Sequence, residues 1–387
     1  MSSPIDDKAF AKLRRILPNQ SDARRAPGDW QARPLPEEIS FKLTNRCDLR
    51  CTHCYQWGEN GYHRSLPRVD VTQDLPLALI DDVLKATRAI RSNVFLWGGE
   101  PLVYRHWAGL VELLADDERW TSVCTNGTLI AQRLESLCRI SRQLELSISI
   151  DGFRAEHDAL RGEGAFDRTM SGLRALVAAR QAGAFRGEIT VNCVIGDALC
   201  PRLCDMVSFL EAEGVETVYL SFPWYISPET AAKMDRYADA HLPAVAATAG
   251  RGHGRPSWHS FDFQLSPDLL PTLRSEIARI DRRPGPVKVR YNPALAEDEM
   301  ATFLAGSDRP AQGKTRCLAL KTRLDVFPNG EVVSCKFFPE LAVGDLNQAP
   351  LQEIWHGAAY DHVRETVATC GLMPICAKCN LLYTRGA

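Results

Sequence analysis

The chain has 387 residues, 45% hydrophobic and 24% charged, so its composition is that of a globular protein and excludes collagen-like, coiled-coil and disordered chains. A formal net charge of −2 gives no electrostatic basis for binding nucleic acid or an anionic membrane. No apolar run is long enough to span a bilayer and the N-terminal segment lacks the apolar core of a signal peptide, so we expect a cytoplasmic protein with neither a nucleic-acid nor a membrane partner.

Residues 1–37 are predicted to form an N-terminal tail with one short helix around residues 10–16. From residue 38 onward, short apolar strands alternate with amphipathic helices. The six predicted strands are 39–44, 93–97, 121–124, 144–150, 188–195 and 217–222, and the predicted helices are 77–90, 107–115, 129–140, 168–181 and 202–213. This alternation predicts an α/β fold, namely a partial (β/α)6 TIM-like barrel over residues 38–223, with its chemistry on the loops at the C-terminal ends of the strands.

The remainder of the chain is less regular. Residues 224–310 contain several prolines and are expected to be a linker or an insertion. Residues 311–387 are predicted to form a small cysteine-rich domain, which begins with a hairpin that turns at Asn329-Gly330. An amphipathic helix is predicted at residues 351–367.

The chain contains 13 cysteines, and the cytoplasm keeps thiols reduced, so clustered cysteines indicate a metal site. Eight of them fall into two groups, Cys47, Cys51 and Cys54 near the start and Cys317, Cys335, Cys370, Cys376 and Cys379 near the end. The other five lie mostly in apolar segments and are expected in the core: Cys124, Cys138, Cys193, Cys200 and Cys204.

The first group, Cys47-x3-Cys51-x2-Cys54, directly follows the first predicted strand. Three thiolates from one loop can hold three irons of a [4Fe–4S] cluster and leave the fourth iron open for another ligand. A three-cysteine zinc site completed by His53 is the alternative. Tyr55, directly after the third cysteine, is expected to pack on an adenine or to cover the cluster.

Five motifs make the sequence similar to the radical S-adenosylmethionine (SAM) enzymes. They are CDLRCTHCY at 47–55, WGGEPL at 97–102, TNGTL at 125–129, SISIDG at 147–152 and HDALRGEGAF at 157–166, the last resembling the branch that carries SPASM or Twitch extensions. The resemblance implies that the open iron binds SAM and that an electron from a flavodoxin- or ferredoxin-type reductant cleaves the sulfonium. The 5′-deoxyadenosyl radical formed in this way then abstracts hydrogen from an unactivated C–H bond of the substrate. The cofactors implied are SAM, a SAM-binding [4Fe–4S] cluster and an auxiliary [4Fe–4S] cluster.

The loop Gly98-Gly99-Glu100-Pro101 follows the second predicted strand. Two glycines allow the backbone to approach a ligand closely, and backbone carbonyls or the Glu100 carboxylate can receive a cationic amino group. By the family resemblance, that group is the α-amino group of SAM. A plain strand-to-helix turn is the alternative for this loop, and also for the turn containing Asn126.

The fourth predicted strand alternates polar and apolar residues. Period two places Ser147, Ser149 and Asp151 on one face, which in a barrel points inward. Buried polar groups need hydrogen-bond partners, and the ribose or carboxylate of SAM would supply them. Asn192 is expected to contribute from the fifth strand. Arg161 is expected either to pair with the SAM carboxylate or to lie on a solvated helix face.

The second cysteine group resembles a Twitch form of the SPASM extension. Cys317, Cys335, Cys376 and Cys379 provide four thiolates, enough to close one auxiliary [4Fe–4S] cluster, with structural zinc as the alternative. Cys370 either replaces one of the four or is not a ligand. A closed cluster would accept the electron left on a substrate radical and so favour oxidation. Three ligands would instead leave an open iron for substrate.

The sequence leaves two enzymatic functions and one non-enzymatic function to be weighed. The first is oxidative modification of a peptide, by a crosslink or a dehydrogenation. Because only about 36 residues precede the predicted barrel, a leader-peptide-binding partner would then be a separate protein. The second is dehydrogenation or epimerisation of a small natural product such as an aminocyclitol or sugar, with decarboxylation of a haem precursor as a further possibility. A non-enzymatic iron–sulfur electron carrier or binding module would not explain the Gly98–Pro101 loop or the inward serines.

Overall fold

The computed structural model describes residues 30–243, 245 and 254–386. The helix expected around residues 10–16 lies outside the described residues. Within the described ranges no helix is both long and apolar enough to cross a lipid bilayer.

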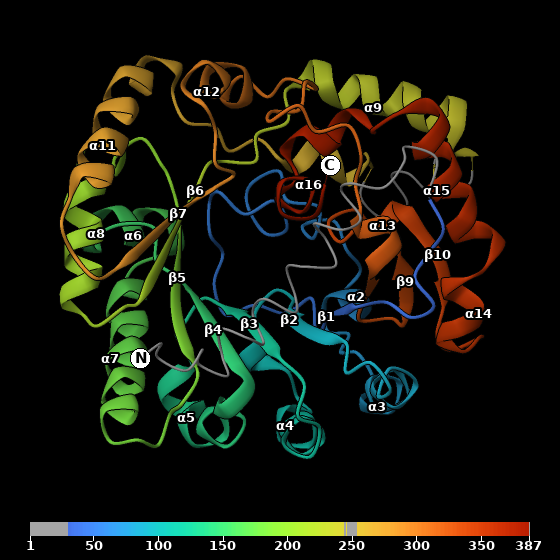
Figure 1. Ribbon diagram of the computed structural model, residues 1–387, viewed down its shortest axis with the longest axis horizontal. Coiled ribbons are helices and arrows are strands. Elements are labelled where there is room, and N and C mark those ends of the chain that lie inside the picture. The colour runs from blue at the N-terminus through green and yellow to red at the C-terminus, as the bar shows by residue number, and fades with distance from the viewer. Residues whose placement is uncertain (1–29, 244, 246–253, 387) are drawn as a thin grey trace, which may run out of the picture.

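One continuous ten-stranded sheet organises the chain, in the spatial order β10-β9-β8-β1-β2-β3-β4-β5-β6-β7. The strands are β1 (Glu38–Lys42), β2 (Asn93–Trp97), β3 (Thr121–Thr125), β4 (Leu144–Ser149), β5 (Glu188–Val194), β6 (Thr217–Ser221), β7 (Lys288–Asn292), β8 (Arg323–Val326), β9 (Glu331–Val333) and β10 (Ala342–Asp345). Strands β1 to β7 run parallel, β8 pairs parallel to β1, and β9 and β10 continue antiparallel. The α/β expectation is confirmed, and Figure 1 shows this sheet curving around an interior.

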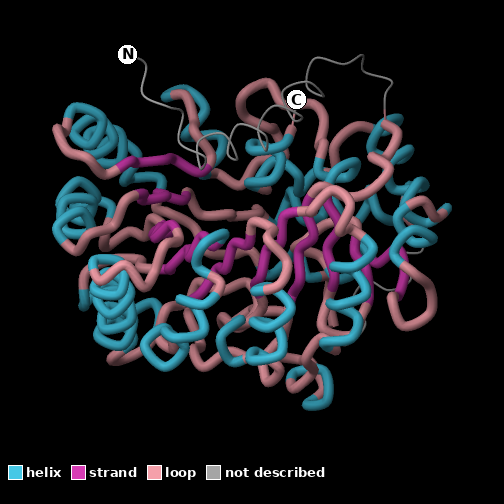
Figure 2. Tube along the Cα trace, turned by 60° about the horizontal axis from the view of Figure 1, so that its bottom comes forward, coloured by secondary structure: helices cyan, strands magenta, loops and turns pink. Residues whose placement is uncertain are grey.

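Helices cover the outer face of the curved sheet (Figures 1 and 2). Those of the barrel are α3 (Leu77–Ala86), α4 (Trp107–Ala115), α5 (Ile130–Arg139), α6 (Arg154–Arg161), α7 (Ala165–Gln181), α8 (Leu203–Ala212) and α11 (Leu270–Arg282). The remaining helices include α2 (Arg68–Val71), α9 (Pro228–His241), α12 (Glu297–Leu304), α13 (Ala319–Thr322), α14 (Leu351–Trp355), α15 (Ala358–Cys370) and α16 (Asn380–Arg385). Strand β4 illustrates the division: Leu144, Leu146 and Ile148 are fully buried in the apolar layer, while the alternate residues face the interior.

The sheet extends beyond the six predicted strands on both sides. The segment 224–310, expected to be a linker or insertion, contributes helices and strand β7, which pairs with β6. The sequence of β7, KVRYN, alternates charged and partly buried residues and therefore lacks the apolar run that marks the other strands. On the other side, β8 joins the cysteine-rich domain to β1 in the same sheet.

The predicted hairpin of the C-terminal domain is present, with β8 and β9 paired antiparallel, but the short helix α13 precedes it. Its turn contains Gly330 at φ +89°, a conformation that favours glycine. The predicted helix over residues 351–367 is two helices, α14 and α15, because the chain breaks at Gly357. A Cβ at Gly357 would lie 2.7 Å from the carbonyl oxygen of Glu353, so the sharp bend requires glycine.

Candidate functional site

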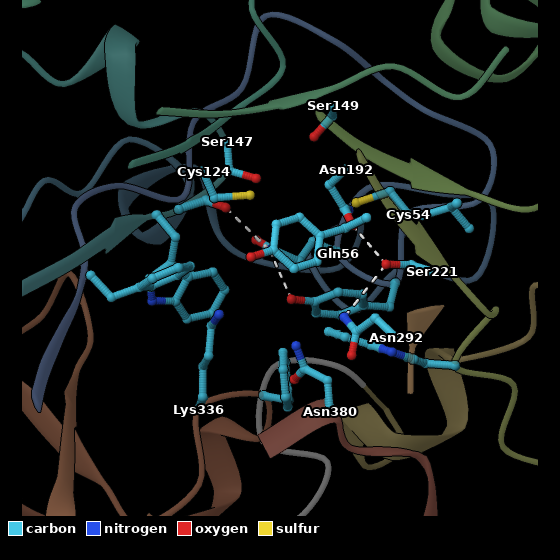
Figure 3. A pocket seen from close by; sticks show the side chains of 18 of the residues that line it. Cys54, Gln56, Cys124, Ser147, Ser149, Asn192, Ser221, Asn292, Lys336 and Asn380 are labelled. Carbon is cyan, nitrogen blue, oxygen red and sulfur yellow. Dashed lines mark hydrogen bonds between the residues drawn. The ribbon is translucent and has the colours of Figure 1, made fainter. Parts of the chain in front are cut away.

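A cavity of about 700 Å³ occupies the interior of the barrel and is bounded by residues from β1 to β7 and by the C-terminal domain. Figure 3 shows polar side chains from the strands on one side and Lys336 and Asn380 from the C-terminal domain on the other. This size is typical of a small-molecule or cofactor site. The cavity therefore marks the candidate site.

The predicted three-cysteine loop forms part of the wall, since Cys47, Cys51 and Cys54 all line the cavity. Backbone N–H groups support two of the sulfurs: Leu49 N lies 3.4 Å from Cys47 Sγ and Trp57 N lies 3.4 Å from Cys54 Sγ. Burial raises the pKa of Cys51 to about 12 and that of Cys47 well above its usual value, so metal binding must displace protons from these thiols. Three cysteines from one loop with N–H donors on two sulfurs fit the cluster that the sequence predicts.

His53, the residue that would complete a zinc site, points to a carboxylate. Its Nε2 lies 3.2 Å from Asp151 Oδ2, and its ring packs against Phe263 with centroids 5.3 Å apart. Among the described residues, no three His, Cys, Asp or Glu side chains are arranged to hold a single metal ion. Tyr55 also lines the cavity and stacks on Phe261 at 4.4 Å between centroids.

The glycines of the second loop face the cavity, whereas Glu100 and Pro101 do not line it. A Cβ at Gly98 would lie 2.5 Å from the carbonyl oxygen of Thr44, so this loop packs closely on the chain that follows β1. The Gly98 carbonyl already accepts a hydrogen bond from Gln56 Nε2 at 3.2 Å.

The Glu100 carboxylate is committed within the protein. Its oxygens accept hydrogen bonds from Leu102 N (2.9 Å), Thr125 Oγ1 (2.7 Å) and Asn126 N (2.7 Å). Burial raises the pKa of Glu100 to about 7. Glu100 therefore fixes the turn that carries Asn126, and its direct contact with SAM stays a prediction.

Asn126 lines the cavity on the other side of that turn. Its Nδ2 donates to Asp48 Oδ1 at 2.8 Å and lies 3.9 Å from Cys47 Sγ. The turn at the end of β3 is thus joined to the cysteine loop by a hydrogen bond between side chains.

On strand β4, the structure has the predicted register: Ser147 and Ser149 line the cavity. Asp151, beyond the strand end, is fully buried and does not line it. Burial alone would raise its pKa, but Arg161 and His53 hold the pKa of Asp151 well below its usual range.

Asp151 positions Arg161. Arg161 Nε donates to Asp151 Oδ2 at 2.6 Å, and Val194 N donates to Asp151 Oδ1 at 2.9 Å. Arg161 itself lines the cavity, with Nη1 4.0 Å from Cys51 Sγ. The solvated helix face, one of the two expectations for Arg161, is wrong because this side chain is buried and paired.

Asn192 lines the cavity from β5, and its Oδ1 accepts a hydrogen bond from Ser221 Oγ at 2.6 Å. Ser221 and Asn292, on β6 and β7, were not singled out by the sequence and continue this polar row (Figure 3). Cys124 was expected in the core but lines the cavity, because period two places it with Ser122 on the inward face of β3. The same periodicity that identified Ser147 would have found it.

The second cysteine group surrounds a separate, mostly apolar cavity of about 40 Å³. Cys317, Cys335, Cys376 and Cys379 all line it, so four thiols from three distant segments meet at one place. Such a donor set fits a closed cluster. Cys370 does not line this cavity; it is exposed at the end of α15, with its Sγ 3.6 Å from His241 Nδ1.

Comparison with known proteins agrees with this arrangement. The radical SAM superfamily model matches residues 41–197, and the iron–sulfur cluster-binding SPASM domain model matches residues 317–380. The chain is 30% identical over 350 residues to the mycofactocin maturase MftC of Mycolicibacterium smegmatis, covering 87% of this chain and 76% of the relative. It is 24% identical over 355 residues to the AdoMet-dependent heme synthase of Methanosarcina barkeri, covering 89% of this chain and 91% of the relative.

Solved structures share the fold. Streptococcus suis SuiB bound to S-adenosylmethionine aligns with a TM-score of 0.58 at 14% identity, over 94% of this chain and 74% of SuiB. The structure of anSMEcpe with bound AdoMet aligns with a TM-score of 0.54 at 15% identity, over 84% of this chain and 82% of that one. The radical SAM domain implies a [4Fe–4S] cluster that binds SAM, and the SPASM domain implies an auxiliary iron–sulfur cluster. The chain belongs to the radical SAM enzymes that carry a C-terminal SPASM domain.

Proposed function

We propose that this radical SAM enzyme oxidatively modifies a peptide, by a crosslink or a dehydrogenation at an unactivated C–H bond. One observation carries the oxidative part of the proposal: Lys336 and Leu381 line both the large cavity and the four-cysteine cavity. A substrate in the large cavity is therefore separated from the auxiliary site by single side chains. That proximity suits transfer of an electron from substrate to the auxiliary site.

The chain's own residues have distinct roles in this proposal. Cys47, Cys51 and Cys54 would hold the first cluster, and the bound cluster with SAM would supply the hydrogen-atom abstraction. Asp151 holds Arg161 at the cavity wall, because Arg161 Nε donates to Asp151 Oδ2 at 2.6 Å. The guanidinium of Arg161 therefore cannot turn to solvent.

Other lining residues prepare the cavity for SAM and for substrate. The hydroxyls of Ser147 and Ser149 offer hydrogen bonds from β4 without any charge. The stacked rings of Tyr55 and Phe261 form a dry wall that excludes water from the reacting C–H bond.

The peptide assignment is supported by relatives of this architecture. MftC is named a maturase of mycofactocin, and SuiB has been solved bound to its precursor peptide SuiA. On this proposal the chain takes electrons from a flavodoxin- or ferredoxin-type reductant and works with a separate leader-peptide-binding protein.

A second candidate is conversion of a haem precursor. The observation that favours it is the match to the heme synthase of Methanosarcina barkeri, which extends over about nine-tenths of both chains. Pre-heme d1 synthase of Dinoroseobacter shibae is also 28% identical over 345 residues.

The test is to reconstitute the protein anaerobically with iron and sulfide and to supply SAM and dithionite. One arm contains any short peptide whose gene neighbours that of this chain, and the other contains a carboxylate-bearing tetrapyrrole. We expect the peptide to lose two hydrogens by mass spectrometry and to accelerate 5′-deoxyadenosine formation. Acceleration by the tetrapyrrole, with an unchanged peptide, would contradict the peptide proposal and support the second candidate.

A further inference from the structure

The C-terminal domain places a cation inside the barrel cavity. Lys336 directly follows the cluster-site residue Cys335 and lines the large cavity. Its Nζ lies over aromatic rings, 3.9 Å from the ring centroid of Phe95, 4.9 Å from Trp97 and 5.2 Å from Phe337. Aromatic faces attract an ammonium group but accept no conventional hydrogen bond, so its three N–H donors remain available.

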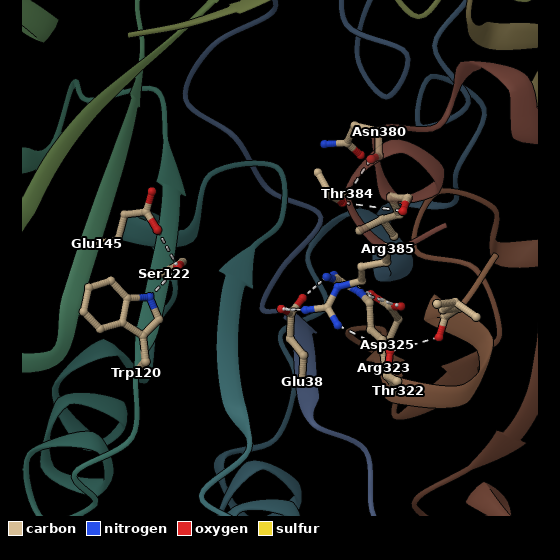
Figure 4. Close-up of polar contacts among 12 residues, drawn as sticks. Glu38, Trp120, Ser122, Glu145, Thr322, Arg323, Asp325, Asn380, Thr384 and Arg385 are labelled. Carbon is tan, nitrogen blue, oxygen red and sulfur yellow. Dashed lines mark hydrogen bonds and ion pairs between the residues drawn. The ribbon is translucent and has the colours of Figure 1, made fainter. Parts of the chain in front are cut away.

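The arginines that line the same cavity are already neutralised. Arg161 pairs with Asp151. Arg323 pairs with Asp325 and Glu38, and Arg385 also pairs with Glu38, as Figure 4 shows. Among the lysines and arginines that line this cavity in the described part of the chain, Lys336 forms no ion pair, and the carboxylates of Asp325 and Glu38, which lie near it, are already paired with Arg323 and Arg385.

A second side chain of the same domain accompanies it. Asn380 directly follows Cys379 and lines the same cavity as Lys336 from the C-terminal domain (Figure 3). Its amide Nδ2 can donate to an anion. Thus the residues that follow two of the four auxiliary cysteines both turn into the cavity.

We propose that Lys336, assisted by Asn380, is the recognition site for a carboxylate of the substrate, which it anchors at the wall shared with the auxiliary site. An ammonium group on an aromatic platform, with arginines that are already paired around it, is complemented by an anion rather than by a second cation or an alkyl group. The remainder of the substrate then extends into the cavity toward Ser221 and Asn292, which line it from β6 and β7 (Figure 3). This inference rests on the proposed function only in taking the large cavity as the substrate site.

The carboxylate could be a peptide terminus or a side-chain or propionate group, and matched probes separate these sources. N-acetyl-L-phenylalanine and its amide represent the peptide terminus. 3-Phenylpropionate and 3-phenylpropanamide represent the other group. Binding is measured by saturation-transfer NMR on the reconstituted full chain with saturating SAM and no reductant, so no turnover is needed.

We expect the acid of at least one pair to bind about tenfold or more tightly than its amide. Lys336→Met should abolish that preference, and Lys336→Arg should keep most of it. Lys378→Met is the matched control: Lys378 also adjoins a cluster-site cysteine, but its Nζ donates to the Phe303 carbonyl at 2.6 Å and it does not line the large cavity. This control should bind both pairs as the native chain does.

Equal affinity for acid and amide in both pairs of the native chain would overturn the proposal, and this comparison needs no variant to fold. Retention of the preference in Lys336→Met, with native iron content, would also overturn it. If the acid competes with SAM instead of binding beside it, Lys336 serves the carboxylate of SAM and the proposal fails. A peptide that is never modified would contradict the proposed function while leaving the acid preference unaffected.

Discussion

Ser149 and its neighbour Ile148 occupy opposite faces of β4, and this makes them a matched pair for the site. Ser149 lines the cavity, and Ile148 is fully buried in the helix-facing layer. Replacement of Ser149 by Val removes the hydroxyl, and the loss of its hydrogen bond costs about 1–3 kcal/mol in a buried complex. We therefore expect about five- to 150-fold weaker SAM affinity by equilibrium dialysis, with unchanged iron content.

Ile148→Val is the control for this variant. It should cost about 0.5–1.5 kcal/mol of unfolding free energy and leave SAM affinity unchanged. If Ser149→Val were merely destabilising while Ile148→Val weakened SAM binding, the contacts assigned to the inward face of β4 would have to be withdrawn.

Glu100 should give the folded protein a specific pH dependence. Burial raises its pKa to about 7 from a usual value of 4.5, so between these values the folded chain holds a proton that the unfolded chain has released. The stability from this group is full below about pH 4.5 and declines as pH rises to about 7, by up to about 1.4 kcal/mol per pH unit. The Gln side chain of Glu100→Gln does not titrate, so the stability of this variant should lack this dependence on pH.

The measurement is urea unfolding of the metal-free native and Glu100→Gln chains from about pH 5 to about pH 8. The native chain should lose stability relative to the variant up to about pH 7, and the difference should then level off. A difference that stays constant between about pH 5 and pH 7 would show that Glu100 is ionised in the folded state throughout.

Sequence alone predicts the role of a residue when that role depends on neighbours close along the chain. The spacing of Cys47, Cys51 and Cys54 is local, and the alternation around Ser149 is local too. Lys336 could not be found in this way, because its place in the barrel cavity depends on packing of a distant domain against β2. Asp151 was expected to face the cavity with the two serines, but it is fully buried and does not line the cavity, and its pair with Arg161 required the tertiary structure.

At the scale of elements, the junction of β1 and β8 joins barrel and C-terminal domain in one sheet. Glu38 on β1 accepts hydrogen bonds from Arg323 on β8 and Arg385 on α16 (Figure 4). Burial alone would raise its pKa, but Arg385 and Arg323 lower the pKa of Glu38, so it is a carboxylate at neutral pH.

Glu38→Ala should destabilise this junction by about 3 kcal/mol, because it leaves the buried guanidinium of Arg323 and the partly buried guanidinium of Arg385 without one of their partners. Urea unfolding followed by circular dichroism measures the loss. Glu112→Ala, which breaks an exposed pair with Arg139, is the control and should change stability little. A Glu38→Ala chain as stable as the control would show that the ionic junction does not hold the two parts together.

The strands that sequence predicts correctly are those with strong apolar patterns, such as β2, whose bounds match the prediction at residues 93–97. Strand β7 was missed because none of its five residues is buried and two of them, Lys288 and Arg290, are charged. Its pairing with β6 alone makes it a strand. The break between α14 and α15 lies at Gly357, a residue that periodicity of the apolar face does not reveal.

For the whole molecule, the two cysteine groups predict the metal content. Cys47, Cys51 and Cys54 line one cavity and the four C-terminal cysteines line another, so we expect about eight irons per chain after anaerobic reconstitution. The double variant Cys376→Ala/Cys379→Ala should hold about four irons and still cleave SAM. Tightly bound zinc in the native C-terminal domain would contradict the auxiliary cluster.

The central claim is that the three-cysteine loop at the barrel cavity holds the cluster at which SAM is cleaved. Its most direct test is 5′-deoxyadenosine formation, quantified by liquid chromatography, from reconstituted protein, SAM and dithionite. The native chain and the Cys376→Ala/Cys379→Ala variant should both form it, whereas Cys47→Ala, Cys51→Ala and Cys54→Ala should each form none above background. Native rates of 5′-deoxyadenosine formation by any of these three single variants would contradict the account.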